Sequence, residues 1–197
     1  STSTKVFVME VMGRHAGWIA AASGLAADDR GLGPDIILFP EVDFDKAAFL
    51  AKVQQTVAEK GQCSIVVSEG AKYADGRFLA DSGLKDAFGH SQLGGVAPVV
   101  TQMIKDELKL KCHWAVCDYL QRAARHIGSK TDMEQAYALG AAAVELAVQG
   151  VNAVMPTIVR TSDTPYQWTT GHAPLADVAN VEEKMPADYI TEDGFFI

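Results

Sequence analysis

The sequence MGRHAG at residues 12–17 combines two glycines with an arginine in a short segment. Gly13 allows the backbone to approach a ligand closely because glycine has no Cβ atom, and Gly17 relieves crowding where a helix starts. The guanidinium group of Arg14 is planar and permanently charged, which suits it to phosphate. These residue types at this spacing predict a site for a phosphorylated ligand. For the Gly-Arg pair alone, an ordinary turn with a solvated arginine is the alternative.

The flanking sequence places this segment between a strand and a helix. Residues 5–9 form an apolar, strand-like run, and residues 18–27 are rich in alanine. In an open α/β sheet such a turn lies at the carboxyl ends of the strands, where ligands bind. We also expect the following helix to direct free backbone N–H groups and its positive dipole end at the ligand. An anion is therefore the predicted ligand.

Other chemically capable side chains also follow predicted strands. Glu69 follows the apolar run 64–68, so its carboxylate is expected at the carboxyl ends of the strands. There it can accept hydrogen bonds from two sugar hydroxyls. A salt bridge on the surface is the alternative role for this residue. Tyr119 ends the predicted strand 113–119, and Arg122 follows shortly after it. Taken alone, Tyr119 also fits a packing role. Arg125 and His126 lie just beyond and either add to a phosphate pocket, cap a helix or face solvent.

Several of these segments resemble one known family. The string EVMGRHAGW at 10–18 closely resembles the fructose 6-phosphate motif of phosphofructokinases. Other similar segments follow in the family's order: VVSEGA at 66–71, QLGGVAP at 92–98, YLQR at 119–122, SKTD at 129–132 and NAVMP at 152–156. The likeness runs through nearly the full chain and is greatest to the pyrophosphate-dependent branch.

The resemblance implies a cytoplasmic phosphotransferase of glycolysis. Such an enzyme transfers a phosphoryl group from pyrophosphate to the 1-hydroxyl of fructose 6-phosphate, giving fructose 1,6-bisphosphate, with Mg²⁺ as cofactor and as a homo-oligomer. Arg14 is the implied catalytic residue, because it would stabilise the phosphoryl group in transfer. The substrate-binding residues implied by the motifs are Met12, Gly13, Arg14, Glu69, Tyr119 and Arg122, with Arg125 and His126 as weaker candidates.

Two parts of the family's machinery do not lie in these residues. These are the glycine-rich segment that holds the phosphoryl donor and the aspartate motif that activates the sugar hydroxyl, and we expect both upstream. The resemblance thus implies a fructose 6-phosphate-binding α/β domain at 1–129 and a segment at 130–197 that returns to a donor-binding domain. No metal ligand is expected in this chain, and alone it is predicted to be inactive. An ATP-dependent 6-phosphofructokinase and a non-catalytic, sugar-phosphate-binding regulatory subunit remain as alternatives.

Composition narrows the class of protein. The 197 residues carry a net charge of -8, with 48% hydrophobic residues, as in a soluble globular protein. No basic stripe is present to neutralise a nucleic-acid backbone, and no apolar run is long enough to cross a bilayer. Cys63, Cys112 and Cys117 form an odd set without a second ligand pair at zinc spacing, so we expect free thiols in a reducing cytoplasm.

The pattern of strands and helices predicts an α/β fold. Strand-like and helical segments alternate as in a three-layer sandwich with a mainly parallel sheet, here a partial phosphofructokinase-like fold without its donor-binding domain. Further strands are expected at 36–39 and 153–157, and residues 72–92 and 160–197 are expected to be mostly irregular. The expected helices are 43–60 or 45–60, 99–108 opened by Pro98, and one that starts at Thr131 with a capping box to Glu134.

Overall fold

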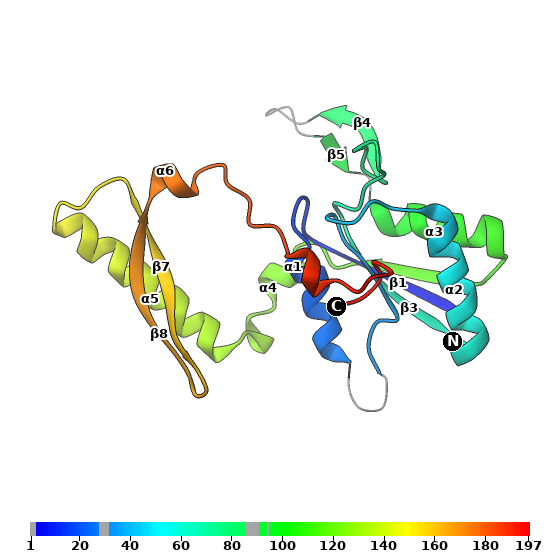
Figure 1. The fold of residues 1–197 in the computed structure, drawn as a ribbon, viewed down its shortest axis with the longest axis horizontal. Helices are drawn as coiled ribbons and strands as arrows, with labels where there is room; N and C mark the ends of the chain where they lie inside the picture. Colours follow the sequence, from blue (N-terminus) through cyan, green and yellow to red (C-terminus); the bar gives the residue numbers. More distant parts are fainter. Residues whose placement is uncertain (1–2, 28–31, 86–90, 94) are drawn as a thin grey trace. The chain divides into compact units, whose positions relative to one another are not determined.

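The computed structural model describes residues 3–27, 32–85, 91–93 and 95–197 (Figure 1). The chain divides into two compact units, one formed by Ser1–Gln121 with Glu183–Ile197 and the other by Arg122–Glu182. The sequence predicts a different division, into a fructose 6-phosphate-binding domain at 1–129 and a segment at 130–197 that returns to the donor-binding domain. That functional division stays a prediction. Arg30, expected to be solvated, and Gly94, expected in a turn, lie outside the described residues.

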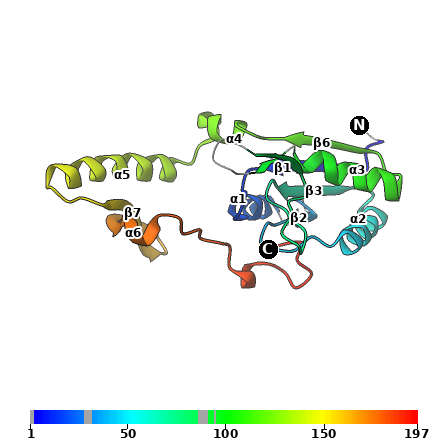
Figure 2. The same cartoon turned by 90° about the horizontal axis from the view of Figure 1, so that it is seen from above.

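The first unit is built on a four-stranded parallel sheet. Its strands are β1 (Val6–Val11), β2 (Ile36–Leu38), β3 (Cys63–Ser68) and β6 (Cys112–Val116). They are ordered β2-β3-β1-β6, and Val6 lies opposite both Cys63 and Cys112. Figure 2 shows the strands in this order. Because parallel sheets are covered on both faces, the continuous apolar runs of the sequence become buried strands here.

Helices cover both faces of this sheet. The helices α2 (Lys46–Lys60) and α3 (Val96–Leu108) bury one face, in a core that includes Val8, Phe49 and Val100. The short helix α1 (Trp18–Ala22), continued by a 3-10 turn at Ser23–Ala26, packs on the other face together with Ile37 and Val66. The predicted three-layer α/β architecture is confirmed.

The boundaries of α2 follow from two local signals. The Oδ1 atom of Asp45 accepts hydrogen bonds from the N–H groups of Ala47 at 2.8 Å and Ala48 at 3.0 Å, which satisfies two free donors at the helix start. Gly61, with a φ of 78°, ends the helix in the left-handed region that favours glycine. The predicted helix from Asp45 to Lys60 is confirmed.

Three expectations for the first unit were wrong in part. The strands β4 (Asp81–Lys85) and β5 (Ser91–Leu93) form an antiparallel pair, although residues 72–92 were expected to be mostly irregular. Residues 86–90, between the two strands, lie outside the described part of the chain. The helix expected at 99–108 begins earlier, at Val96, with Pro98 in its first turn. The strand expected at 113–119 ends at Val116, and a turn leads to α4 (Leu120–Ala123).

The second unit contains one long helix and one long hairpin. The strands β7 (Val154–Asp163) and β8 (Tyr166–Pro174) pair antiparallel, and α5 (Lys130–Val148) packs against them. A short helix α6 (Leu175–Val178) follows the hairpin, and a 3-10 turn lies at Arg125–Ile127, while the 3-10 turn at Ala187–Tyr189 belongs to the first unit. The expectation of irregular structure from residue 160 onward was therefore wrong through residue 174.

The start of α5 also differs from the expectation. Its N-cap is Ser129, whose Oγ accepts a hydrogen bond from the N–H of Asp132 at 3.3 Å, so the cap lies two residues before the predicted cap at Thr131 and the helix begins at Lys130. The helix ends at Val148, as expected from Gly150.

Candidate functional site

The loop after β1 is held against the end of β3. The backbone N–H of Gly13 donates a hydrogen bond to Oε1 of Glu69 at 3.1 Å, and the hydroxyl of Ser68 donates to the carbonyl oxygen of Gly13. Gly13 has a φ of 134°, and a Cβ there would lie 2.7 Å from the carbonyl oxygen of Ala16. This position therefore requires glycine. We call residues 12–17 the substrate loop.

Gly70 brings the second motif into direct contact with this loop. A Cβ at Gly70 would lie 1.8 Å from the carbonyl oxygen of Arg14, so only glycine allows the two backbones to lie this close. Gly70 is itself buried. Two motifs more than fifty residues apart in sequence thus form one structural element.

The start of α1 differs from the expected anion site. The N–H of Gly17 donates to Oε1 of Glu41 at 2.8 Å, so a carboxylate from this chain already lies at the helix start. The helix has only five residues, too short for a substantial dipole. At Gly17 the expectation of a free N–H group was wrong, because the carboxylate of Glu41, distant in sequence, occupies that place. Gly17 does relieve crowding, since a Cβ there would lie 2.7 Å from Oε2 of Glu41.

A cavity of about 280 Å³ opens at the carboxyl ends of β1, β3 and β6. This is the edge where ligands bind in open α/β sheets. Its lining residues are Glu10, Val11, Met12, Glu69, Gly95, Val116 and Asp118. The predicted residues Met12 and Glu69 therefore share one cavity, together with two carboxylates that were not predicted.

Glu10 is the functional candidate that sequence reasoning missed. Its side chain is buried, and its Oε2 accepts a hydrogen bond from the N–H of Ala97 at 2.8 Å, at the start of α3. Burial raises the pKa of Glu10, and the negative charges of Glu69 and Asp118 raise it further. The available signal was a single carboxylate inside an otherwise apolar strand, since buried carboxylates with shifted pKa values gather at functional sites.

The remaining predicted residues of the first unit lie in or next to the substrate loop. The N–H of Met12 donates to Oε1 of Gln121 at 3.4 Å, and the side chain of Arg14 is half-buried. His15 is exposed and stacks on Phe78 with ring centroids 6.1 Å apart. Tyr119 follows β6 in a turn and is 66% exposed, which does not fit the alternative of a packing residue.

Three predicted residues belong to the second unit. Arg122 lies in α4, while Arg125 and His126 lie in the 3-10 turn that follows, and all three side chains are exposed. The first unit thus brings together Met12, Gly13, Arg14 and Glu69, and the part that these three cations play in the site stays a prediction.

The described residues contain neither a ready metal-binding cluster nor a membrane-spanning helix. Among them, no three His, Cys, Asp or Glu side chains cluster closely enough to bind a metal ion. Within the same described ranges, no helix has the length and apolar character that a membrane span requires. Cys63 and Cys112 are buried free thiols, as predicted for these two, and burial raises the pKa of Cys63 to about 12.

Known proteins resemble the chain along its whole length. The Phosphofructokinase family model matches residues 1–147. Two curated relatives are named pyrophosphate–fructose 6-phosphate 1-phosphotransferase: that of Halomonas elongata is 65% identical and that of Methylococcus capsulatus 62%, over all 197 residues. In each case the chain spans 47% of the relative's length.

A solved structure shows the same arrangement. The pyrophosphate-dependent phosphofructokinase of Nitrosospira multiformis is 62% identical and superposes with a TM-score of 0.86, over 100% of this chain and 46% of that protein. The resemblance in the motifs is confirmed by these matches. The chain belongs to the phosphofructokinase family.

Proposed function

We propose that this chain is the sugar-phosphate-binding part of a pyrophosphate-dependent 6-phosphofructokinase. The full-length enzyme would transfer a phosphoryl group from pyrophosphate to the 1-hydroxyl of fructose 6-phosphate, giving fructose 1,6-bisphosphate and orthophosphate. The observation that carries the proposal is the packing of the substrate loop on Glu69 and Gly70, which joins two of the family's motifs beside a cavity. The names of the similar proteins support the same donor and acceptor.

The substrate loop would lie between the sugar and the donor. The backbone of Met12 and Gly13 would line the space between the sugar and the donor. Glu69 holds this backbone in place through its hydrogen bond with the N–H of Gly13. Arg14 follows directly and would stabilise charge on the phosphoryl group as it moves. Phosphoryl transfer depends on positioning and charge neutralisation, so a fixed arginine beside the acceptor is the contribution this loop can make.

Glu69 would hold the sugar as well as the loop. A carboxylate has two oxygens, each with more than one lone pair, so it can accept from the N–H of Gly13 and from sugar hydroxyls together. Its position in the cavity wall supports this role, because a ligand at the carboxyl ends of the strands would meet these acceptors. Glu69 thereby couples sugar binding to the geometry of the substrate loop.

The 6-phosphate would be held by cations from the segment after β6. Tyr119 supplies a phenol and Arg122 a guanidinium fork that can bind two phosphate oxygens at once. Arg125 and His126 follow within one turn and are further candidates. We assign the 6-phosphate to this segment because YLQR at 119–122 resembles the family's motif, and the resemblance implies that its arginine binds this phosphate.

Magnesium would accompany the donor. Bound with the donor, Mg²⁺ would supply positive charge that offsets the negative charge of phosphoryl transfer. The carboxylates of Glu10 and Glu69 at the cavity already accept backbone hydrogen bonds, and no metal cluster lies among the described residues, so the ion would be held mainly by the donor and its domain. We further propose that the full-length enzyme is a homo-oligomer that acts in glycolysis. A cytoplasmic location is also proposed, because free buried thiols are typical of a reducing compartment.

Turnover by the full-length protein tests the donor. We expect reversible formation of fructose 1,6-bisphosphate with pyrophosphate, because a phosphoanhydride is exchanged for a phosphate monoester and orthophosphate. Assays with pyrophosphate and with ATP, each with Mg²⁺ and fructose 6-phosphate, separate the alternatives. Turnover with ATP alone would favour an ATP-dependent kinase, and sugar-phosphate binding without turnover would favour a regulatory subunit; either result would contradict the proposal.

A further inference from the structure

The last residues of the chain return to the first unit as a strap. We call residues 183–197 the C-terminal strap; they cross from α1 past β2 to α2. Met185 is buried in the core beneath α1, and the N–H of Ile37 on β2 donates to the carbonyl oxygen of Phe195 at 2.8 Å. The strap is therefore an integral part of the substrate-binding unit.

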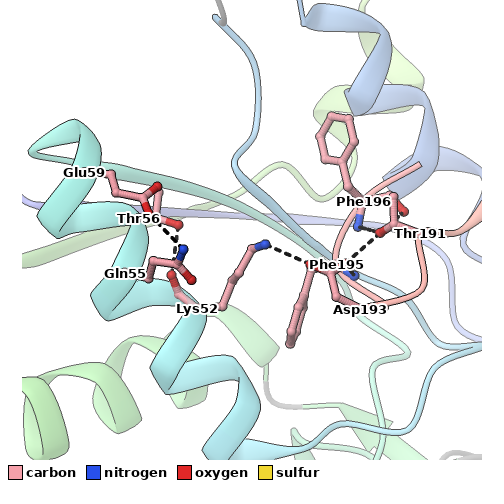
Figure 3. Close-up of polar contacts among 8 residues, drawn as sticks. All are labelled: Lys52, Gln55, Thr56, Glu59, Thr191, Asp193, Phe195 and Phe196. Carbon is pink, nitrogen blue, oxygen red and sulfur yellow. Dashed lines mark hydrogen bonds and ion pairs between the residues drawn. The ribbon is translucent and has the colours of Figure 1, made fainter.

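Asp193 anchors one end of the strap to α2. Its Oδ2 accepts a hydrogen bond from Nζ of Lys52 at 2.8 Å, and its Oδ1 accepts from the hydroxyl of Thr191 at 2.8 Å and from the N–H of Phe195 at 3.1 Å (Figure 3). These contacts lower the pKa of Asp193 to about 2. One carboxylate thus orders the strap's final turn and ties it to a helix of the core.

The other end of the strap lies against the substrate loop. The indole N–H of Trp18 donates to the carbonyl oxygen of Glu183 at 2.8 Å, and its ring meets Tyr189 edge-on with centroids 6.3 Å apart. The decisive contact is made by Glu41, whose Oε1 accepts from the N–H of Gly17 at 2.8 Å and from the N–H of Met185 at 3.1 Å. A single oxygen atom therefore joins the loop to the strap.

The second oxygen of Glu41 makes this arrangement unusual. Oε2 is buried without a hydrogen-bond partner in the described part of the chain. An unsatisfied buried oxygen is unfavourable, so the two donors on Oε1 must hold the side chain in place. Gly17 is required for this placement, because a Cβ there would lie 2.7 Å from Oε2.

We infer that Glu41 is a positioning residue for phosphoryl transfer: by bridging Gly17 and Met185, it lets the docked strap fix the position of the substrate loop and hence of Arg14. The inference rests on the proposed function in assigning the loop to fructose 6-phosphate and the moving phosphoryl group. Gly13 is already held by Glu69 at the loop's first half, so Glu41 constrains the second half. Arg14 lies between these two attachments.

Truncation of Glu41 in the full-length protein tests the bridge. Glu41→Ala should speed amide hydrogen exchange in residues 12–18 and in residues 183–190. It should also lower kcat about 10- to 100-fold while KM for fructose 6-phosphate changes less, since small misplacements of a catalytic group cost about this much. Glu41→Gln keeps a carbonyl oxygen that accepts both hydrogen bonds, so it should restore slow exchange and most of kcat. Glu107→Ala, which removes an exposed ion pair with Lys46, is the matched control.

Asp193→Asn tests the same coupling from the far end of the strap. It should speed exchange in residues 12–18, but it should have no further effect on that segment in a Glu41→Ala background. Unchanged loop exchange in Asp193→Asn or Glu41→Ala would overturn the inference, as would an unaltered kcat in Glu41→Ala or a Glu41→Gln variant as impaired as Glu41→Ala. If the wild type shows no turnover, the proposed function fails, and the exchange of the loop alone decides whether Glu41 links the strap to it.

Discussion

Gly13 and Glu69 are joined by a hydrogen bond of 3.1 Å from the backbone N–H of one to Oε1 of the other, across the ends of β1 and β3. The bond connects the loop that carries Arg14 with a carboxylate in the cavity wall. Any ligand that engages Glu69 therefore acts on the loop as well. Arg14 is part of this connected loop, whereas Arg122 lies outside it in α4.

Arg14→Ala in the full-length enzyme should lower kcat with a smaller change in KM for fructose 6-phosphate. The proposed partner of Arg14 is charge that moves during transfer, so the lost interaction belongs to the transition state. Steady-state kinetics at saturating pyrophosphate measure both constants. A pure rise in KM would contradict this role.

Arg122→Ala should act mainly on KM. A charge-assisted contact to phosphate contributes about 1.5–3 kcal/mol, which corresponds to a rise in KM of about ten- to a hundredfold. The same assay provides the measurement, with free inorganic phosphate as a weak competitor to check the charge. An unchanged KM would remove Arg122 from the site.

Glu10→Gln should stabilise the chain more at pH 8 than at pH 5. The pKa of Glu10 is raised in the folded state, so the wild-type carboxyl contributes stability below its ordinary pKa and loses that contribution as pH rises through the folded value. Glutamine keeps an acceptor for the N–H of Ala97 without this loss.

Melting temperatures of the Glu10→Gln variant and the wild type at both pH values measure this effect. Glu107→Gln is the control, because Lys46 lowers the pKa of Glu107, whose contribution to stability is then lost only below its ordinary pKa; its difference from wild type should be the same at pH 5 and pH 8. A difference between Glu10→Gln and wild type that is the same at pH 5 and pH 8 would show that Glu10 does not titrate as described.

The isolated chain should lack phosphofructokinase activity, and it should either self-associate through residues 131–157 or leave that segment poorly ordered. No residue of α5 is buried, and Tyr137 and Val148 are 82% and 83% exposed. Burial of one large aliphatic side chain contributes about 1.5–3 kcal/mol, so this surface favours a partner. Size-exclusion chromatography with light scattering and hydrogen exchange measure the outcome. A strict monomer with slow exchange throughout α5 would refute the prediction.

Local signals predicted much of the first unit. The helix α2 follows from Asp45 at its start and Gly61 after its end, since both act on neighbouring backbone groups. The parallel strands follow from short apolar runs that must be buried on both faces. The substrate loop and Glu69 were placed at the correct edge because that edge is a property of the fold class.

Features that depend on distant residues were not predictable in the same way. Glu41 lies 24 residues from Gly17, and nothing in the sequence shows that its carboxylate would occupy the start of α1. The sequence predicts a strand that ends at Thr157, whereas β7 extends to Asp163. The prediction ends early because the threonine and aspartate residues after Thr157 are typical of loops. Ser129 replaces Thr131 as N-cap, since both hydroxyls fit the same local pattern.

The substrate loop and Gly70 are proposed to act as one site for fructose 6-phosphate. Calorimetric binding of fructose 6-phosphate to full-length Gly70→Ala tests it most directly, because the added Cβ would lie 1.8 Å from the carbonyl oxygen of Arg14 and must displace the loop. Gly140→Ala is the matched control, since a Cβ there meets nothing within 4 Å. We predict that Gly70→Ala loses at least about tenfold in affinity, equivalent to about 1.4 kcal/mol, while Gly140→Ala binds like the wild type. Wild-type affinity in a folded Gly70→Ala protein would contradict the account.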